Sequence, residues 1–493
     1  MTGEEFIYAI YITSFLFLFL PIVYVLHRLV HKNIYLSNLL LLAASSFFYY
    51  YGEQEKILIM YFVIILNWLT GWYVYSGTHD DNTYIEKNPM QKFVLFGCIG
   101  VCIGLLWYYK YLNFSIAIFN DVFNPNQPIE YIKGIVLPLG ISFYTFHVLS
   151  YTLDVYFGRL KVEKNFFNLA SYVFMFPQLI AGPIVRYIDI KHQFYHRNMT
   201  LLGTINGLRI FFYGFAKKVL IANTIAIYVD EVFSKNVANL TTLDCWIGGI
   251  GYSVQIYFDF SGYSSMAIGL AMLFGFRYKE NFNFPYIAKS ASEFWHRWHI
   301  SLSTWLRDYV YINIGGNRVS AWRKHFNVIF VFFCSGLWHG ANTTFVCWGL
   351  LYGICIMLEN MGWKKVTDKF SAIGHIYLLL VAITGWVMFR ADSMSYAAEY
   401  IKKMYLVDFS QLYCSVNIEN NIIFAMIMGI IFSYDWRTVY KNTCVCLAEK
   451  FNKRSTVFFI QKVSAFVVST ALFVISIASV ISSSHNPFIY FRF

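Results

Sequence analysis

The chain has 493 residues, of which 58% are hydrophobic and only 13% are charged. A soluble domain carries about 25% charged residues because its surface must be solvated, so this composition excludes an ordinary soluble protein. The mean hydropathy is +0.50. The formal net charge of +11 would suit a nucleic-acid binder, but the basic residues stand in short loops between apolar runs. We therefore expect membrane lipid, and no nucleic acid, around this chain.

Apolar runs long enough to cross a bilayer, which takes about 20 residues, recur along the chain. The first run, Phe6–Leu26, follows Glu4 and Glu5 and no basic segment. No small-residue cleavage site follows it, so we expect an anchor and not a signal peptide. The other uninterrupted runs are Ile57–Ser76, Phe93–Tyr109, Ile373–Phe389 and Val463–Ile481.

Polar residues interrupt a second set of runs, which comprises Thr200–Tyr228, Trp246–Phe276 and Asn327–Ile356. Together the two sets predict an all-α, polytopic integral membrane protein with roughly ten to thirteen transmembrane or re-entrant helices. No internal repeat or low-complexity linker divides the chain. We expect one transmembrane domain over 1–493, with plain helices in 1–110 and 372–493 and the chemistry in 135–345.

The loops carry the clearest sign of orientation. Lysine and arginine gather at Arg28 and Lys32, at Arg159, Lys161 and Lys164, at Lys364, Lys365 and Lys369, and at Lys450, Lys453, Arg454 and Lys462. Cytoplasmic loops carry such an excess. We therefore expect these loops inside the cell and both chain ends outside. The nine cysteines lie mostly in apolar runs, which predicts buried small side chains, no disulfide framework and no metal site.

An ionisable residue within an apolar run is costly and is a functional candidate by default. Asp259 is one such residue, and Gln255 lies four residues earlier on the same helical face. A buried structural acid that joins neighbouring helices explains Asp259 as well as a carboxylate that orients a catalytic histidine does.

His339 is the second candidate, within Phe332–Asn342. Gly336 and Gly340 flank it, so backbone or ligand can approach closely. A lone intramembrane histidine often serves only helix packing. However, the unperturbed pKa of imidazole is near 6.5, so a neutral histidine can take a hydroxyl proton at physiological pH.

The third candidate segment, Glu293–Asp308, combines tryptophans, histidines and arginines, a mixture typical of the membrane–water interface. His296 and His299 are three residues apart and share a helical face, as zinc ligands could. No His-Glu-x-x-His pattern or cysteine pair accompanies them, so a solvated interfacial face is the better interpretation.

The segment Trp298–Leu302, followed by Gly336–Ala341, resembles the signature of the membrane-bound O-acyltransferase family. The chain is most similar to the bacterial alginate O-acetylase branch of that family. Further resemblance to the branch lies in Leu137–His147, Phe176–Arg186, Tyr257–Tyr263, Asn281–Tyr286 and the tail Asn486–Phe493. One departure is His296, where the branch usually has arginine.

The resemblance implies membrane helices around a central funnel or tunnel, with His339 as the invariant histidine and His299 as the second functional histidine. We expect direct acyl transfer, in which His339 is the general base and His299 or Asn342 stabilises the oxyanion. Asp259 or Gln255 would fix an imidazole tautomer, and Trp298, Trp338 and Ser335 would line the tunnel. No bound cofactor is expected.

The expected donor is an acyl thioester, either acetyl-coenzyme A or an acyl-carrier protein. A basic face would receive its phosphates or acidic surface, although ordinary positive-inside bias explains that face equally well. Its members are Arg297, Arg307, Arg318, Arg323 and Lys324. The resemblance further implies a bacterial inner membrane, an outside polysaccharide acceptor and an extracytoplasmic SGNH-type acetyltransferase partner, whose side chain is an alternative first acceptor.

Three other functions stay open at this point. D-alanyl transfer to teichoic acid is the nearest within the family. A polysaccharide or acyl transporter, with histidine and aspartate as a proton relay, is the candidate from another class. Lipid acyl transfer is the third. The sequence does not identify the polymer, and alginate, cellulose and peptidoglycan are all compatible with it.

Overall fold

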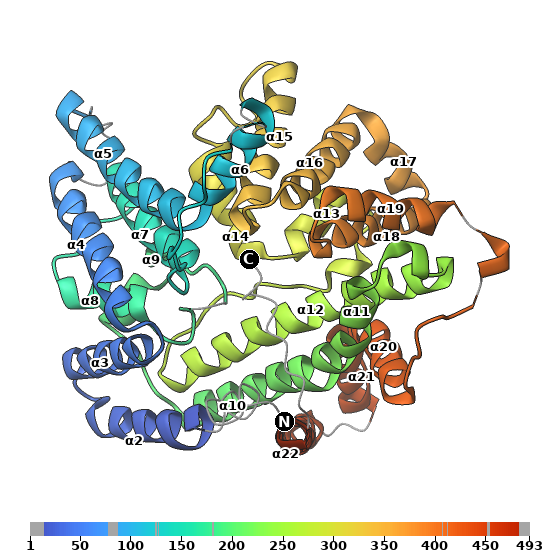
Figure 1. Ribbon diagram of the computed structural model, residues 1–493. Coiled ribbons are helices and arrows are strands. Elements are labelled where there is room, and N and C mark those ends of the chain that lie inside the picture. Colours follow the sequence, from blue (N-terminus) through green and yellow to red (C-terminus); the bar gives the residue numbers. More distant parts are fainter. Residues whose placement is uncertain are drawn as a thin grey trace. The chain divides into compact units, whose positions relative to one another are not determined.

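The computed structural model describes residues 14–76, 87–123, 126, 128–179, 182–406, 408–411, 413–450 and 454–482. These residues form helices and no strand (Figure 1). Glu4 and Glu5 before the predicted anchor, Lys453 of a basic loop and the tail residues 486–493 lie outside the described residues. The chain divides into two compact units, described separately below.

One unit contains Thr13–Gly203 and Ala271–Lys279. Asn67 on α4 shows how it buries polar groups: its Oδ1 accepts a hydrogen bond from Thr152 of α7 at 2.6 Å. Gly71, one turn further along α4, is required there because a Cβ would lie 2.8 Å from the Tyr151 hydroxyl. The helices of this unit are η1 (Phe15–Phe19), α2 (Leu20–Val30), α3 (Ile34–Glu53), η2 (Gln54–Lys56), α4 (Ile57–Val74), α5 (Pro89–Leu106), η4 (Trp107–Tyr111), α6 (Leu112–Phe123), α7 (Ile141–Tyr156), α8 (Phe166–Phe174), α9 (Tyr187–Ile190) and η5 (Lys191–Phe194).

The other unit contains the described residues of Thr204–Leu270 and Glu280–Phe493, and it holds both candidate histidines. Its longest helix is α12, which carries Gln255 and Asp259. The helices are α10 (Leu201–Ala216), η6 (Lys217–Asn223), α11 (Thr224–Ser234), η7 (Val237–Asn239), α12 (Thr242–Leu273), η8 (Pro285–Ile287), α13 (Ala291–Arg297), α14 (Ile300–Leu306), η9 (Arg307–Tyr311), α15 (Ala321–His339), α16 (Thr343–Leu358), η10 (Glu359–Trp363), α17 (Lys364–Lys369), α18 (Ser371–Arg390), α19 (Met394–Tyr405), η11 (Phe409–Gln411), α20 (Asn420–Phe432), α21 (Trp436–Lys450) and α22 (Arg454–Ser482).

A network around Asp244 closes the start of α12. Its carboxylate accepts hydrogen bonds from the Ser415 hydroxyl and amide and from Thr241. Burial alone would raise the pKa of Asp244, but these hydrogen bonds outweigh it and lower that pKa. The network ties the helix to the loop that precedes α20.

The described residues contain six helices long and apolar enough to cross a membrane, or seven if the bent pair α20 and α21 forms one span. They confirm the predicted uninterrupted runs apart from the first, which lies partly outside the described residues. Thr200–Tyr228 falls in a span, Leu201–Ser234. Trp246–Phe276 corresponds to α12, and Asn327–Ile356 is broken into α15 and α16. The further crossings needed for ten to thirteen remain a prediction.

Candidate active site

His339 is the last residue of α15, at the point where the predicted run Asn327–Ile356 breaks. Glycines bring α15 and α16 into close contact just before it. A Cβ on Gly336 would lie 2.4 Å from the Phe345 carbonyl oxygen, and one on Gly349 would lie 2.3 Å from that of Phe332. The close approach predicted at Gly336 is therefore made by backbone, and it fixes where His339 stands.

Aromatic rings surround the His339 imidazole. The ring centroids of Trp338, Trp348 and Phe389 lie 5.0, 5.1 and 5.2 Å from it. All four side chains are buried. Three aromatic side chains therefore pack edge-on against the imidazole.

His299 precedes α14 and takes a left-handed backbone conformation, with φ 43° and ψ 54°. Asn281 holds this turn in place. Its carbonyl oxygen accepts from the Ile300 amide at 2.9 Å, and its side-chain Oδ1 accepts from the Ser301 amide at 3.0 Å. Non-glycine residues adopt this conformation rarely, and mostly where the surroundings enforce it.

The contacts of His299 define its tautomer. Nδ1 lies 3.3 Å from Asn281 Oδ1, an atom that must be an acceptor because it also receives the Ser301 amide hydrogen. We therefore assign the proton to Nδ1. Nε2 is then a lone-pair acceptor, and it has no hydrogen-bond partner among the described residues. Burial lowers the pKa of His299 to about 3, so the neutral form persists.

The two histidines meet the same indole. The Trp338 ring lies 6.0 Å from His299 and 5.0 Å from His339. A second chain of rings runs from Trp298 through Trp386, at 4.7 Å, to Trp348, at 5.8 Å. Two segments that are forty residues apart in sequence therefore meet at one buried indole.

Asp259 has a different partner from the one anticipated. Its carboxylate forms a buried ion pair with Lys218 of η6. No described contact joins it to either histidine, so the structural interpretation of this acid is the better supported. Gln255 is buried one turn earlier, and its Oε1 has no partner among the described residues.

Ser335 and Asn342 flank His339 along the chain. Ser335 is buried one turn before it on the same face of α15. Asn342 caps α16: its Oδ1 accepts from the Thr344 amide at 3.2 Å, and its Nδ2 donates to the Asp392 carbonyl at 3.0 Å. The side-chain amide of Asn342, which the sequence suggested as an oxyanion donor, is therefore already engaged in capping α16 and in the bond to Asp392.

The predicted basic face is partly neutralised by local pairs. Arg297 pairs with Glu293 at 2.9 Å, and Arg307 pairs with its neighbour Asp308 at 2.7 Å. Arg318 and Arg323 are exposed. Lys324 is half-buried. His296 is exposed, and its Nδ1 lies 2.6 Å from the Ser292 carbonyl oxygen. The described residues hold no group of three or more metal-ligating side chains.

Sequence reasoning missed Glu359, a buried acid within the apolar segment that leads out of α16. Its carboxylate accepts hydrogen bonds from the amides of Ala291 and Ser292 at 2.6 and 3.0 Å, at the start of α13. α13 leads directly to Trp298 and His299. The signal was available, because a carboxylate in an apolar run is itself a functional candidate.

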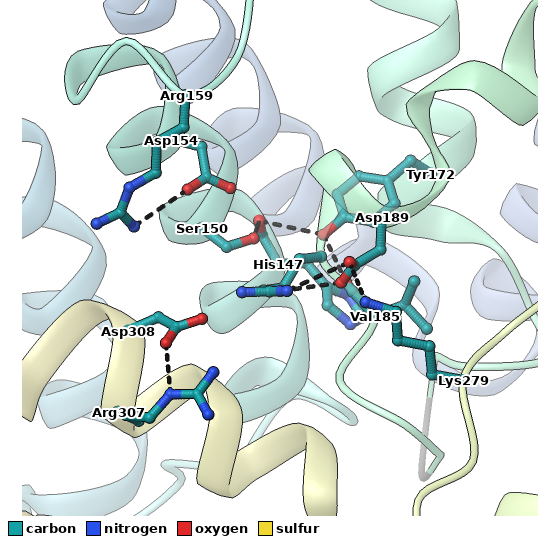
Figure 2. Close-up of polar contacts among 11 residues, drawn as sticks. His147, Ser150, Asp154, Arg159, Tyr172, Val185, Asp189, Lys279, Arg307 and Asp308 are labelled. Carbon is teal, nitrogen blue, oxygen red and sulfur yellow. Dashed lines mark hydrogen bonds and ion pairs between the residues drawn. The ribbon is translucent and has the colours of Figure 1, made fainter.

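Two of the family-like motifs, Leu137–His147 and Phe176–Arg186, fall in the other unit, where His147 and Val185 lie among polar side chains (Figure 2). The Tyr172 hydroxyl donates to the Val185 carbonyl at 2.7 Å, and Asp189 pairs with Lys279. Asp154 pairs with Arg159 at 3.6 Å. Both ring nitrogens of His147 are buried without a partner among the described residues.

Comparison with known proteins gives a consistent result. The family model described as MBOAT, membrane-bound O-acyltransferase family, matches residues 134–397. A Pseudomonas putida protein named "Probable alginate O-acetylase AlgI" is 36% identical over 88% of this chain and 90% of its own length. The peptidoglycan O-acetyltransferase of Helicobacter pylori is 36% identical over 65% of this chain and 66% of its own length. The teichoic acid D-alanyltransferase of Bacillus subtilis is 29% identical over 52% and 68%.

Proposed function

The chain belongs to the membrane-bound O-acyltransferase family, in its alginate O-acetylase-like branch, and from that premise we propose that it acetylates an extracytoplasmic polysaccharide. It is an O-acyltransferase and an integral, multi-pass membrane protein. Membership of this enzyme family favours acyl transfer over transport as the function of the chain. The observation that carries the proposal is the placement of His299 and His339 against one buried indole, Trp338.

The chemistry needs no acyl-enzyme, because a thioester donor is already activated. His339 removes the proton of an acceptor hydroxyl, whose oxygen forms a bond to the thioester carbonyl carbon. The carbon–sulfur bond breaks, and the leaving thiolate takes up the proton from His339. The packed rings around His339 keep water away and hold donor and acceptor together.

His299 supports this reaction as a hydrogen-bond acceptor. An oxyanion needs N–H donors, and the neutral tautomer with its proton on Nδ1 offers none at Nε2. The lone pair at Nε2 instead fits a donor group of a substrate, such as a second sugar hydroxyl or an amide N–H in the arm of the thioester. We therefore assign to His299 the orientation of substrate and not the stabilisation of the oxyanion.

Three further elements complete the proposal. The donor is acetyl-coenzyme A or an acyl-carrier protein, received on the inner side near the exposed residues Arg318 and Arg323. The enzyme lies in the inner membrane with both ends of the chain outside. An extracytoplasmic SGNH-type acetyltransferase takes part in the last transfer, so the hydroxyl that His339 activates belongs to the polysaccharide or to that partner.

D-alanyl transfer to teichoic acid is the second candidate, favoured by the similarity to the Bacillus subtilis D-alanyltransferase. Acetyl transfer ranks first because the relatives with 36% identity are named as acetylases or acetyltransferases. Offering the purified protein labelled acetyl and D-alanyl thioesters in parallel separates the two.

His339→Ala tests the proposed chemistry. This variant should reach the membrane and elute as the wild type does, yet lose at least about 100-fold in acetyl transfer, as expected when a general base is removed. His325→Ala, on the same helix, is the matched control and should keep its activity. Transfer by His339→Ala within about threefold of the wild type would remove His339 from the mechanism.

A further inference from the structure

A cavity opens where the last part of one candidate membrane span, η10 and α17, approaches the next span, α18. Its volume is about 400 Å³, and its lining residues are Leu358, Met361, Gly362, Trp363, Val366 and Tyr377. The spans Thr343–Lys369 and Ser371–Arg390 meet here, through α16, η10, α17 and α18 (Figure 1). The volume lies within the range of about 300–1,000 Å³ that is common for small-molecule sites.

A local distortion of the helix makes the cavity. η10 is a π-helical turn, and Gly362 within it has φ 135°, which no other residue type adopts comfortably. The distortion places Trp363 across from Tyr377 of α18, with ring centroids 5.8 Å apart. Leu358 and Met361 remain 48% and 68% exposed. An apolar occupant would cover this surface at little cost.

Charge beside the cavity is positive. Lys364, Lys365 and Lys369 on α17 are all exposed, against a single exposed acid on that helix, Asp368. The other nearby carboxylate, Glu359, is buried and accepts hydrogen bonds from the protein. Trp363 next to them is a typical membrane–interface anchor. Apolar walls with cations at one end match the build of a phospholipid, whose chain is apolar and whose phosphate is anionic.

We propose that this cavity binds an anionic phospholipid of the surrounding membrane, one acyl chain packing against Trp363 and Tyr377 and the phosphate pairing with Lys364 and Lys365. The site is separate from the acyl-transfer site and does not depend on the proposed function. A zwitterionic lipid offers the same chain without net negative charge, so the lysines determine the preference. Each lysine near an anionic lipid surface contributes about a fivefold factor in affinity.

The position of Tyr377 links the cavity to the histidine segment. Its hydroxyl donates to Glu359 Oε1 at 3.3 Å, and the same carboxylate caps α13 through the amides of Ala291 and Ser292. A lipid chain packed against Tyr377 would contact the residue that hydrogen-bonds to Glu359. The cavity is therefore one hydrogen bond away from the cap of α13.

The test uses the full-length purified protein in detergent, delipidated and then titrated with phosphatidylglycerol or phosphatidylcholine, with native mass spectrometry as the readout. The wild type should bind phosphatidylglycerol at least about tenfold more tightly than phosphatidylcholine. Lys364→Gln with Lys365→Gln should lose about 25-fold in phosphatidylglycerol affinity, from two lysines, and leave phosphatidylcholine affinity unchanged. Lys32→Gln with Lys441→Gln, two exposed lysines elsewhere, is the matched control.

A second variant tests the cavity itself. Val366→Trp fills it with an indole and should reduce binding of both lipids while the protein still elutes as a folded species. Equal binding of the two lipids by the wild type, or an equal loss in the control pair, would overturn the proposal. Displacement of the lipid by acetyl-coenzyme A would also overturn it, because the cavity would then be a donor site.

Discussion

The carboxylate of Glu359 reaches from one helix to the first turn of another, and its removal should disturb the site at His299. Glu359→Ala leaves the amides of Ala291 and Ser292 without their buried acceptor. Each unsatisfied buried donor costs about 1–3 kcal/mol, so for the two amides we expect a loss of about 2–6 kcal/mol of folding free energy. Glu359→Gln keeps the shape and one acceptor oxygen, and it should cost about half as much. The negative charge of a carboxylate also interacts favourably with a helix N-terminus, and the neutral glutamine lacks this interaction.

Thermal unfolding followed by size exclusion in detergent measures the loss of stability. Acetyl transfer at saturating donor measures the disturbance at His299. The turnover number should fall in the order wild type, Glu359→Gln, Glu359→Ala, because the cap holds the start of α13, the helix that leads to His299. Asp368→Asn removes a nearby exposed acid and serves as the control. If Glu359→Ala retained both wild-type stability and wild-type turnover, the link from Glu359 to His299 would be refuted.

Three further predictions concern other buried polar groups. Asn281→Ala removes the acceptor of the His299 Nδ1 hydrogen and should lower turnover on the order of 10–100-fold with a smaller change in KM; unchanged turnover would contradict the tautomer assignment. Lys218→Met leaves the Asp259 charge buried and unpaired and should cost about 3–5 kcal/mol in thermal unfolding, whereas Lys218→Met with Asp259→Leu should cost less; a double variant worse than the single would contradict the ion pair. Hydrogen bonds hold the pKa of Asp244 below its usual value, so its stabilisation is full above about pH 4 and is lost as the pH falls further. Asp244→Asn should therefore lower the melting temperature at pH 7 but converge with the wild type in acid, and a constant difference at all pH values would refute the assignment.

The membrane spans were predictable because each depends on a local property, about 20 apolar residues in a row. His339 stood out as a candidate for a related reason, since a titratable residue in such a run is conspicuous, and its catalytic role stays a prediction. The break in the helix after His339 could not be predicted. The run Asn327–Ile356 is apolar on both sides of this point and offers only glycines and Asn342 as signals of a break. In the structure these residues end α15 and cap α16.

Partners across the sequence could not be predicted. Asp259 was visible as a costly acid, but nothing in the sequence separates a histidine from Lys218, 41 residues earlier, as its partner. The tautomer of His299 likewise depends on Asn281, which belongs to a different motif. Such pairings require the fold, because the physical rule demands a partner without saying which residue supplies it.

The left-handed backbone at His299 determines which substitutions there can be interpreted. Histidine itself already carries the conformational penalty of about 1–2 kcal/mol at φ 43°, and alanine is found in this region less often than histidine, so its substitution also changes the cost of the turn. Asparagine tolerates this conformation better than other non-glycine residues, and glycine adopts it freely. His299→Asn therefore isolates the loss of the Nε2 lone pair, whereas His299→Ala mixes it with a displaced turn. At this position the backbone angle decides which mutant is informative, before any chemistry is considered.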